Sequence, residues 1–191
     1  METLTKSEVQ LRVQELIERI NEGDIFIHPT DTIYGIGCNA LDEKAVKKIR
    51  KLKERKESPF SLWVPSKDWI REHCVVPKEG EKWLDKLPGP YTLILKLKQN
   101  NVIAPSVSMG AETIGVRIPN HWFNRVVELA QTPIITTSAN RSGKQFMTSL
   151  EDLDKEIKDG VRFCVYEGEK NGKPSNIVHL TEKLKIVERT S

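Results

Sequence analysis

Polar side chains crowd the segment 28–38, which follows a short apolar run at 25–27. The apolar run predicts a buried strand that stops at Pro29. In open α/β sheets, ligands bind at the ends of strands, so this segment predicts a site for an oxygen-rich ligand. One or two of its hydroxyls could instead satisfy the backbone of a turn, but that would not explain the whole cluster. The polar side chains are those of Thr30, Asp31, Thr32 and Tyr34.

A second polar cluster occupies the segment 136–143, which reads Thr-Thr-Ser-Ala-Asn-Arg-Ser-Gly. Ser138 or Asn140 could cap a helix that starts near Arg141, and the exposed amides of a helix start bind anions. Between the two clusters, the segment 53–55 supplies a lysine and an arginine. Together the three segments predict one site for a small anionic ligand.

The common nucleotide-binding motifs are incomplete in this sequence. A P-loop ending at Ser142-Gly-Lys144 would need glycine where the chain has Ser138. A dinucleotide fingerprint starting at Gly35 would need glycine where the chain has Ala40. No serine–histidine–aspartate or cysteine–histidine pattern stands out either. The remaining chemistry is positioning and charge stabilisation, as in phosphoryl or nucleotidyl transfer.

Positive charge is concentrated between Lys44 and Lys56, where eight basic residues stand against the single acid Glu54. This patch could meet a phosphate-bearing ligand or RNA. It could also be a solvated helix face whose last lysines favour the negative end of the helix dipole. We favour the solvated face for most of these lysines and weigh Lys53 and Arg55 separately, because they lie where the helical pattern breaks.

Two further arginines have open roles. Arg117 lies in a strand whose apolar residues face the opposite way, so it is either a solvent-side residue or a clamp for a carboxylate. Taken alone, Arg189 is interpreted as an ordinary residue of the C-terminal tail without a role in the site.

Composition indicates a soluble globular protein, with 191 residues, 38% hydrophobic and 30% charged residues and a net charge of +3. This length fits a single domain covering residues 1–191. The sequence has no apolar run long enough for a membrane span and no signal peptide, so we expect a cytoplasmic protein without a membrane partner. Its three cysteines form no CxxC pair and its four histidines are scattered, so we expect no structural metal.

Strands and helices are interleaved along the chain, which predicts a single α/β domain on a twisted, mixed parallel and antiparallel open sheet. The hairpin-like pair 91–98 and 113–118 argues against a purely parallel sheet. Thr5 and Glu8 form the pattern of a capping box. We predict helices at 5–20, 42–53, 121–131 and 150–158, two short helical pieces at 69–83, and strands at 25–27, 60–64, 91–98, 113–118, 133–137, 161–166, 175–180 and 184–189.

Six ordered motifs spread over essentially the whole chain resemble the YrdC family, which includes the threonylcarbamoyl-AMP synthases. The motifs are Pro29-Thr-Asp-Thr-Ile-Tyr-Gly-Ile-Gly37, Leu52-Lys-Glu-Arg55, Leu87-Pro-Gly-Pro-Tyr-Thr92, Gly115-Val-Arg-Ile-Pro119, Ser138-Ala-Asn-Arg-Ser-Gly143 and Pro174-Ser-Asn-Ile-Val178. The resemblance implies a YrdC-like fold with a basic concave face. It also implies an L-threonylcarbamoyladenylate synthase, a nucleotidyltransferase that uses L-threonine, bicarbonate, ATP and Mg²⁺. Its product would pass to a downstream threonylcarbamoyl transferase complex for tRNA modification.

The resemblance also assigns roles residue by residue. Lys53 and Arg55 would be catalytic and face the ATP phosphates. The residues implied for threonine binding are Thr32, Trp63, Arg117 and Ser175. Those implied for nucleotide binding are Arg55, Ser58, Thr113, Ser138, Asn140, Ser142 and Arg189. The chain departs from the family pattern at Ser58-Pro-Phe60, Thr137 and Asn176, and Trp63 stands where relatives often have histidine.

Two other functions compete with the synthase. One is a double-stranded RNA or tRNA-binding module without its own catalysis, although the chain has no aromatic–basic stripe of the RNA-recognition type. The other is carbamoyl transfer in metallo-enzyme maturation, because a related domain occurs in larger hydrogenase-maturation proteins. The accompanying zinc-finger and acylphosphatase-like segments are missing from this sequence, and it would end after the catalytic-type domain.

Overall fold

The computed structural model describes residues 1–181 and 184–189. Its strands are β1 (Glu2–Leu4), β2 (Phe26–His28), β3 (Gly35–Gly37), β4 (Ser61–Trp63), β5 (Cys74–Val75), β6 (Tyr91–Leu97), β7 (Thr113–Arg117), β8 (Ile134–Ser138), β9 (Phe163–Val165), β10 (Asn176–His179) and β11 (Lys185–Val187). They form one sheet in the order β1-β9-β2-β3-β8-β4-β7-β6-β10-β11, with β5 paired to β6. The sheet is therefore built from strands that lie far apart in the sequence.

The predicted mixed sheet is confirmed. Pairs β1–β9, β2–β9, β4–β7 and β6–β10 are parallel. Pairs β2–β3, β3–β8, β4–β8, β6–β7 and β10–β11 are antiparallel. The antiparallel pairing of β6 with β7 is the one that the hairpin-like spacing of these two segments predicts.

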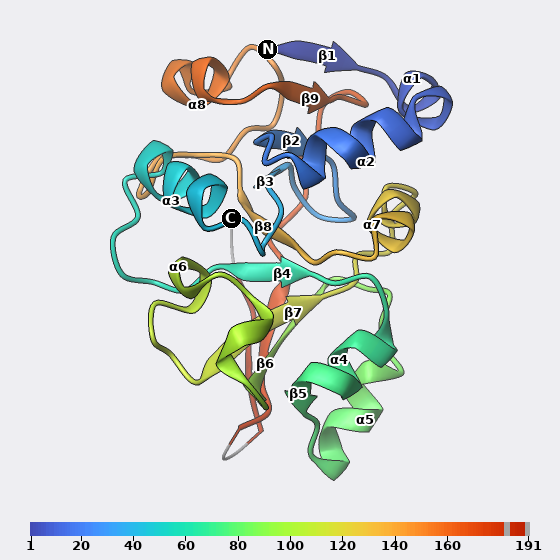
Figure 1. Cartoon of the computed structure of the whole chain (residues 1–191), viewed down its shortest axis with the longest axis vertical. Coiled ribbons are helices and arrows are strands. Elements are labelled where there is room, and N and C mark those ends of the chain that lie inside the picture. The colour runs from blue at the N-terminus through green and yellow to red at the C-terminus, as the bar shows by residue number, and fades with distance from the viewer. Residues whose placement is uncertain (182–183, 190–191) are drawn as a thin grey trace.

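Eight α-helices and one short 3₁₀ helix connect the described strands. They are α1 (Lys6–Leu11), α2 (Val13–Asn21), α3 (Glu43–Leu52), α4 (Lys67–His73), α5 (Lys78–Leu84), η1 (Asn100–Val102), α6 (Pro105–Ser108), α7 (Asn124–Ala130) and α8 (Lys155–Gly160). Figure 1 shows α4, α5 and α6 gathered around the half of the sheet that contains β6 and β7. No helix in the described part of the chain is both long and apolar enough to cross a membrane.

Three sequence expectations need correction. The helix predicted at 5–20 starts with the expected capping box, but it breaks at Arg12, whose guanidinium binds both Glu2 and Glu15. The helix expected to start near Arg141 does not form. The helix predicted at 150–158 begins only at Lys155, because Asp154 caps its first amides.

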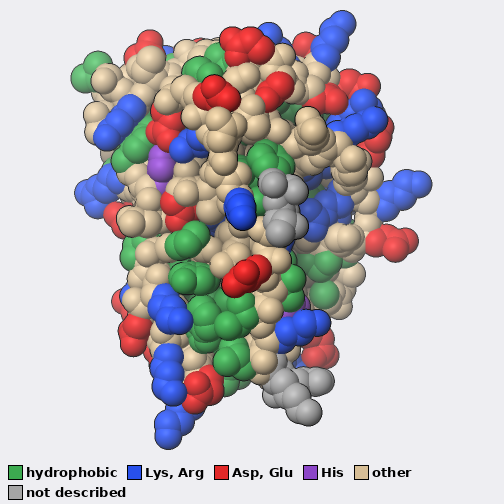
Figure 2. Space-filling view, turned by 180° about the vertical axis from the view of Figure 1, so that it is seen from behind, with side chains coloured by type: hydrophobic (Ala, Val, Ile, Leu, Met, Phe, Trp, Pro, Cys, Tyr) green, Lys and Arg blue, Asp and Glu red, His purple; other side chains and the backbone are tan. Residues whose placement is uncertain are grey.

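Two hydrophobic cores lie on opposite faces of the sheet. Neighbouring residues alternate between them: Ile27 and Leu62 belong to one core, while Phe26 and Trp63 belong to the other. Side chains of α2 and α7 cover the second core. Figure 2 shows the side of the molecule opposite to Figure 1, where acidic and basic side chains are interspersed around a group of hydrophobic ones.

Candidate active site

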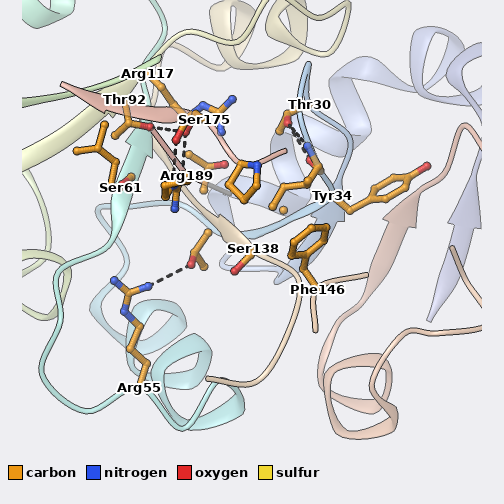
Figure 3. Close-up of a pocket in the computed structure, with 16 residues that line it drawn as sticks. Thr30, Tyr34, Arg55, Ser61, Thr92, Arg117, Ser138, Phe146, Ser175 and Arg189 are labelled. Atoms are coloured by element: carbon orange, nitrogen blue, oxygen red, sulfur yellow. Dashed lines mark hydrogen bonds between the residues drawn. The ribbon is translucent and has the colours of Figure 1, made fainter. Parts of the chain in front are cut away.

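A cavity of about 210 Å³ lies on the sheet face that also carries Trp63 and the second core. Strand register explains how this cavity forms. Ser61 is paired with Gly115 on β7 and with Thr136 on β8, and paired positions project from the same face. The lining residues are Thr30, Ile33, Tyr34, Gly35, Arg55, Ser61, Thr92, Arg117, Thr136, Thr137, Ser138, Phe146, Pro174, Ser175, Ile177 and Arg189 (Figure 3).

Glycine at position 115 leaves room on the floor of this cavity. A Cβ atom at Gly115 would lie 2.7 Å from Ser61 Oγ and 3.0 Å from a methyl carbon of Thr92. Both distances are shorter than ordinary van der Waals contact, so a larger residue would push these hydroxyl-bearing side chains aside.

Three arginines, Arg55, Arg117 and Arg189, converge on the cavity from different parts of the chain. Burial lowers the pKa of Arg189, and burial together with the charge of Arg189 lowers the pKa of Arg55. Burial is also the main reason that the pKa of Arg117 falls to about 10, with Asp31 opposing the shift. Arg189 also repels both of the others, because its charge lowers the pKa of Arg55 and that of Arg117. An anion entering the cavity would relieve that repulsion.

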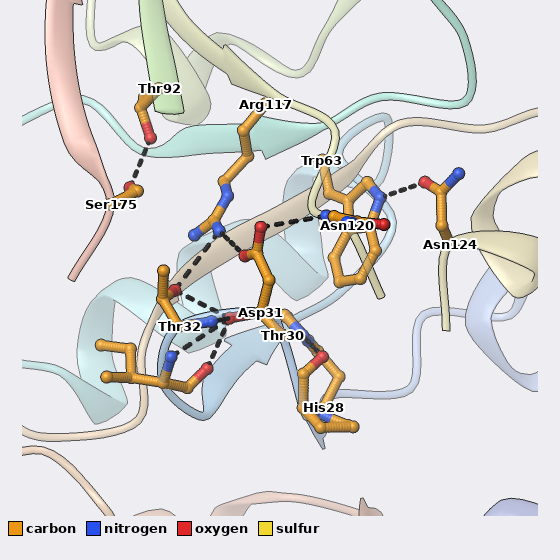
Figure 4. A network of polar contacts seen from close by, with 12 residues as sticks. His28, Thr30, Asp31, Thr32, Trp63, Thr92, Arg117, Asn120, Asn124 and Ser175 are labelled. Atoms are coloured by element: carbon orange, nitrogen blue, oxygen red, sulfur yellow. Dashed lines mark hydrogen bonds and ion pairs between the residues drawn. The ribbon is translucent and has the colours of Figure 1, made fainter. Parts of the chain in front are cut away.

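Asp31 orients Arg117 through a nearly buried ion pair (Figure 4). The Nη2 atom of Arg117 donates to Asp31 Oδ1 at 2.8 Å and to Thr32 Oγ1 at 3.3 Å. The second oxygen of Asp31 accepts the backbone N–H of Asn120 at 3.0 Å. Thr30 Oγ1 accepts the amide of Thr32 at 3.0 Å, which fixes the loop. Arg117 therefore reaches the cavity already held in one orientation.

Arg189 joins the site through Ser175. Its Nε donates to the Ser175 carbonyl at 2.8 Å and its Nη2 lies 3.0 Å from Ser175 Oγ. Ser175 Oγ is also 2.8 Å from Thr92 Oγ1 (Figure 3). The segment after β11 is thereby tied to β6, and this places a third cation in the cavity.

A Schellman motif at the end of α3 directs Arg55 toward the cavity. The amide of Arg55 donates to the carbonyl of Arg50, and the amide of Glu54 donates to the carbonyl of Lys51. Glu54 takes the left-handed conformation that this motif requires, with φ of 53°. Arg55 Nη1 then donates to Thr137 Oγ1 at 3.3 Å.

Lys53 lies beneath the 138–140 loop and does not line the cavity. It is 2% exposed, and its Nζ donates to the carbonyls of Ser138 and Asn140 and to Asn140 Oδ1. Burial, with a smaller effect of Arg55, lowers the pKa of Lys53 to about 7, while its three oxygen acceptors favour the charged form. In this structure Lys53 holds the loop; its contact with phosphate stays a prediction.

Several other predicted residues lie outside the cavity. Trp63 shares the face of Arg117, but it is fully buried and donates to Asn124 Oδ1 at 2.8 Å. Thr113 lies at the far end of β7, in a separate hollow. Ser58 and Ser142 are exposed. Their roles in nucleotide binding stay predictions.

The structure brings together the predicted residues Arg55, Arg117, Ser138, Ser175 and Arg189 as cavity-lining groups, with Thr32 and Asn140 hydrogen-bonded to them. Ser61, Thr92 and Phe146 line the same cavity but were missed. Ser61 and Thr92 carry a signal in hindsight, because each is a hydroxyl residue alternating with leucine in a strand. Phe146 lies in an irregular loop, and nothing in its sequence surroundings marks it.

The described residues contain no group of three or more His, Cys, Asp or Glu side chains that could hold a metal ion. Among the described residues that line the cavity, none carries a carboxylate. Fold and site together define a mixed α/β protein with a polar, cationic cavity suited to anionic ligands.

Comparison with known proteins identifies the family. The Sua5/YciO/YrdC family model, described as "Telomere recombination", matches residues 18–190, and the chain belongs to this family. A protein of Methanocaldococcus jannaschii named putative threonylcarbamoyl-AMP synthase is 38% identical over 94% of this chain and 85% of its own length. A threonylcarbamoyl-AMP synthase of Pyrococcus abyssi is 34% identical over 85% of this chain but only 49% of its own length.

Solved structures agree with this assignment. The crystal structure of P. abyssi Sua5 complexed with L-threonine has a TM-score of 0.84 and 30% identity, covering 94% of this chain and 54% of that one. The structure of Escherichia coli YciO also has a TM-score of 0.84, at 20% identity, and supports the fold alone. This chain therefore spans about half of the P. abyssi protein.

Proposed function

We propose that this protein makes L-threonylcarbamoyladenylate and pyrophosphate from L-threonine, bicarbonate and ATP. The observation that carries the proposal is the group of three arginines in a cavity otherwise lined mainly by hydroxyl and apolar side chains. Each of the three substrates brings an anionic group that such a cavity would attract. The names of the two archaeal relatives, and the L-threonine bound to P. abyssi Sua5, support the same choice.

Threonine would bind at Arg117. Its carboxylate would pair with the guanidinium that Asp31 holds in place. The hydroxyls of Thr32 and Ser175 lie next to Arg117 and Arg189, where they can accept or donate hydrogen bonds to the bound amino acid. Direct contact from Trp63 would require its ring to leave the second core.

ATP phosphates would face Arg55 and Arg189, with Ser138 at the loop that Lys53 holds. Because none of the described lining residues carries a carboxylate, Mg²⁺ would enter with ATP and be held mainly by phosphate oxygens and water. When bound, it would add positive charge beside the phosphates.

The reaction joins two anions. The threonine amine attacks the carbon of bicarbonate, and water leaves to give a carbamate. A carbamate oxygen then attacks the α-phosphorus of ATP, the bond to the β-phosphate oxygen breaks, and pyrophosphate leaves with the electron pair. The arginines would lower the repulsion between carbamate and triphosphate and hold them in line.

The product is a reactive mixed anhydride. We propose that a separate threonylcarbamoyl transferase complex consumes it to modify tRNA, and that residues 1–191 form one catalytic domain. Any direct contact with tRNA belongs to this proposal as well.

The test is pyrophosphate release from ATP, Mg²⁺ and bicarbonate, with and without L-threonine. Arg55→Ala and Arg117→Ala should abolish threonine-dependent release. Lys53→Ala should impair it by freeing the 138–140 loop. Arg125→Ala, at a 70% exposed side chain outside the cavity, is the matched control and should stay active. Folded wild-type protein that releases no pyrophosphate would refute the proposal and favour an RNA-binding role.

A further inference from the structure

Arg50 is a buried arginine that has no carboxylate partner in the part of the chain that the structure describes. It lies near the end of α3 and is 8% exposed. No ion pair forms between Arg50 and any acidic residue of the described chain. The sequence places it in the basic stretch that we interpreted mainly as a solvated helix face. That interpretation suits the exposed Lys47, Lys48 and Lys51 but is wrong for Arg50.

The guanidinium of Arg50 donates to four backbone carbonyls instead. Two of them belong to the loop that follows α3: Nη1 lies 3.2 Å from the carbonyl oxygen of Arg55 and 3.1 Å from that of Ser58. Arg55 Nε donates to the same Ser58 carbonyl at 3.3 Å. Both guanidiniums also lie over the ring of Phe60, with distances to its centroid of 4.4 Å for Arg50 and 5.0 Å for Arg55.

The other two carbonyls anchor Arg50 to α6. Its Nε donates to the carbonyl of Ser106 at 2.6 Å and its Nη2 to that of Val107 at 3.2 Å. The Val107 carbonyl also accepts the amide of Phe60 at 3.0 Å. Arg50 thus links α6 to the carbonyls of Arg55 and Ser58, two residues of the loop that carries Arg55.

Packing alone does not explain why a charged residue occupies this buried position, because burying the charge costs free energy. Burial and the nearby charge of Arg55 both disfavour the protonated form and lower the pKa of Arg50, while the charge of Glu43 opposes the shift. An apolar side chain of similar length could fill the same space without that penalty. Only a forked, planar guanidinium can serve carbonyls on two sides at once, and lysine cannot reproduce this geometry.

We propose that Arg50 is a positioning residue that fixes the 53–60 loop so that Arg55 faces the cavity. It also keeps a second positive charge behind Arg55, where it adds to the attraction for a polyanion. The inference rests on the proposed function in one respect, namely that Arg55 faces the phosphates of ATP.

The test compares Arg50→Lys with Arg19→Lys. Arg19 is a matched control because it also lies over a phenylalanine ring, Phe163 at 4.7 Å, and is bound to Glu2 and Asp24 outside the cavity. Both variants should lose thermal stability. Only Arg50→Lys should raise KM for ATP, by roughly tenfold, the factor that one charge-assisted hydrogen bond typically supplies. KM for threonine should stay unchanged in both.

A second measurement separates this inference from the proposed function. Calorimetric binding of inorganic tripolyphosphate needs no catalysis, and Arg50→Lys should weaken it while Arg19→Lys should not. Phe60→Leu removes the shared ring but keeps the carbonyl contacts, and should weaken tripolyphosphate binding to a smaller extent. If Arg50→Lys and Phe60→Leu fold and bind tripolyphosphate like the wild type, the positioning role is refuted. If wild-type protein binds tripolyphosphate but makes no adenylate, the proposed function fails while this test still stands.

Discussion

Acidification should destabilise this protein through His28, a fully buried histidine. Its ring lies among Phe26, Trp63 and Phe123, with centroid distances of 5.5 to 5.8 Å. Nδ1 has only a long contact of 3.4 Å to the carbonyl of Pro29, and Nε2 has no hydrogen-bond partner among the described residues. Protonation would therefore place an unsatisfied charge in an apolar core.

The size of the effect follows from linkage. Burial lowers the pKa of His28 from 6.5 to about 3. Below pH 6.5 the unfolded chain binds a proton that the folded protein does not bind until about pH 3, so stability falls as the pH falls through this range. At about 1.4 kcal/mol per pH unit, the loss by pH 5 is about 2 kcal/mol.

Urea unfolding at pH 7 and pH 5 measures this loss directly. His28→Met is the comparison, because methionine fills a similar volume and does not titrate. Wild-type protein should lose about 2 kcal/mol more than the variant between the two pH values. The pKa of Glu167, lowered to about 2, matters only at more acidic pH, because the carboxyl of the unfolded chain titrates near 4.5. Equal losses in wild type and variant would refute the account of His28.

Three further changes have defined outcomes. Asp31→Ala leaves Arg117 buried without its partner and should lower the free energy of unfolding by about 3 kcal/mol in urea; an unchanged value would mean that water replaces the carboxylate. Gly172→Ala places a Cβ 2.1 Å from the carbonyl oxygen of Thr32, so it should lower the free energy of unfolding by roughly 1–3 kcal/mol and lower the melting temperature with it. An unchanged melting temperature would contradict this steric argument. Met109→Gly relieves a φ of 54° at an exposed position and should add about 1 kcal/mol, whereas Met109→Ala should not.

Local sequence signals predicted the regular elements well where side chains alternate or repeat. The strand predicted at 113–118 is observed at Thr113–Arg117, and the helix predicted at 42–53 at Glu43–Leu52. Strand β3 was missed because two of its three residues are glycines, whose pairing depends on the neighbouring strands and on the packed ring of His28. Strand β1 was missed because β9, its partner among the described strands, lies at the other end of the sequence.

The candidate site was only partly predictable for a similar reason. Arg55, Arg117 and Ser138 belong to local motifs, and the fold brings them to one cavity. The partners of Lys53 and Arg50 are mainly backbone carbonyls. Every residue has a backbone carbonyl, so the sequence does not indicate which carbonyl will accept a hydrogen bond from a given side chain.

Arg189 is bound to Ser175 and completes the cavity, so the cavity cannot be complete before residue 189 has been synthesised. The cavity needs side chains from Thr30 to Arg189, and β10 pairs in parallel with β6, which is made much earlier. Such non-local pairing is slow to form. During translation, a ligand that needs all of these side chains therefore cannot stabilise a partly made chain by binding to this cavity. Until residue 189 has been made, the stability of the nascent protein depends on its own packing alone.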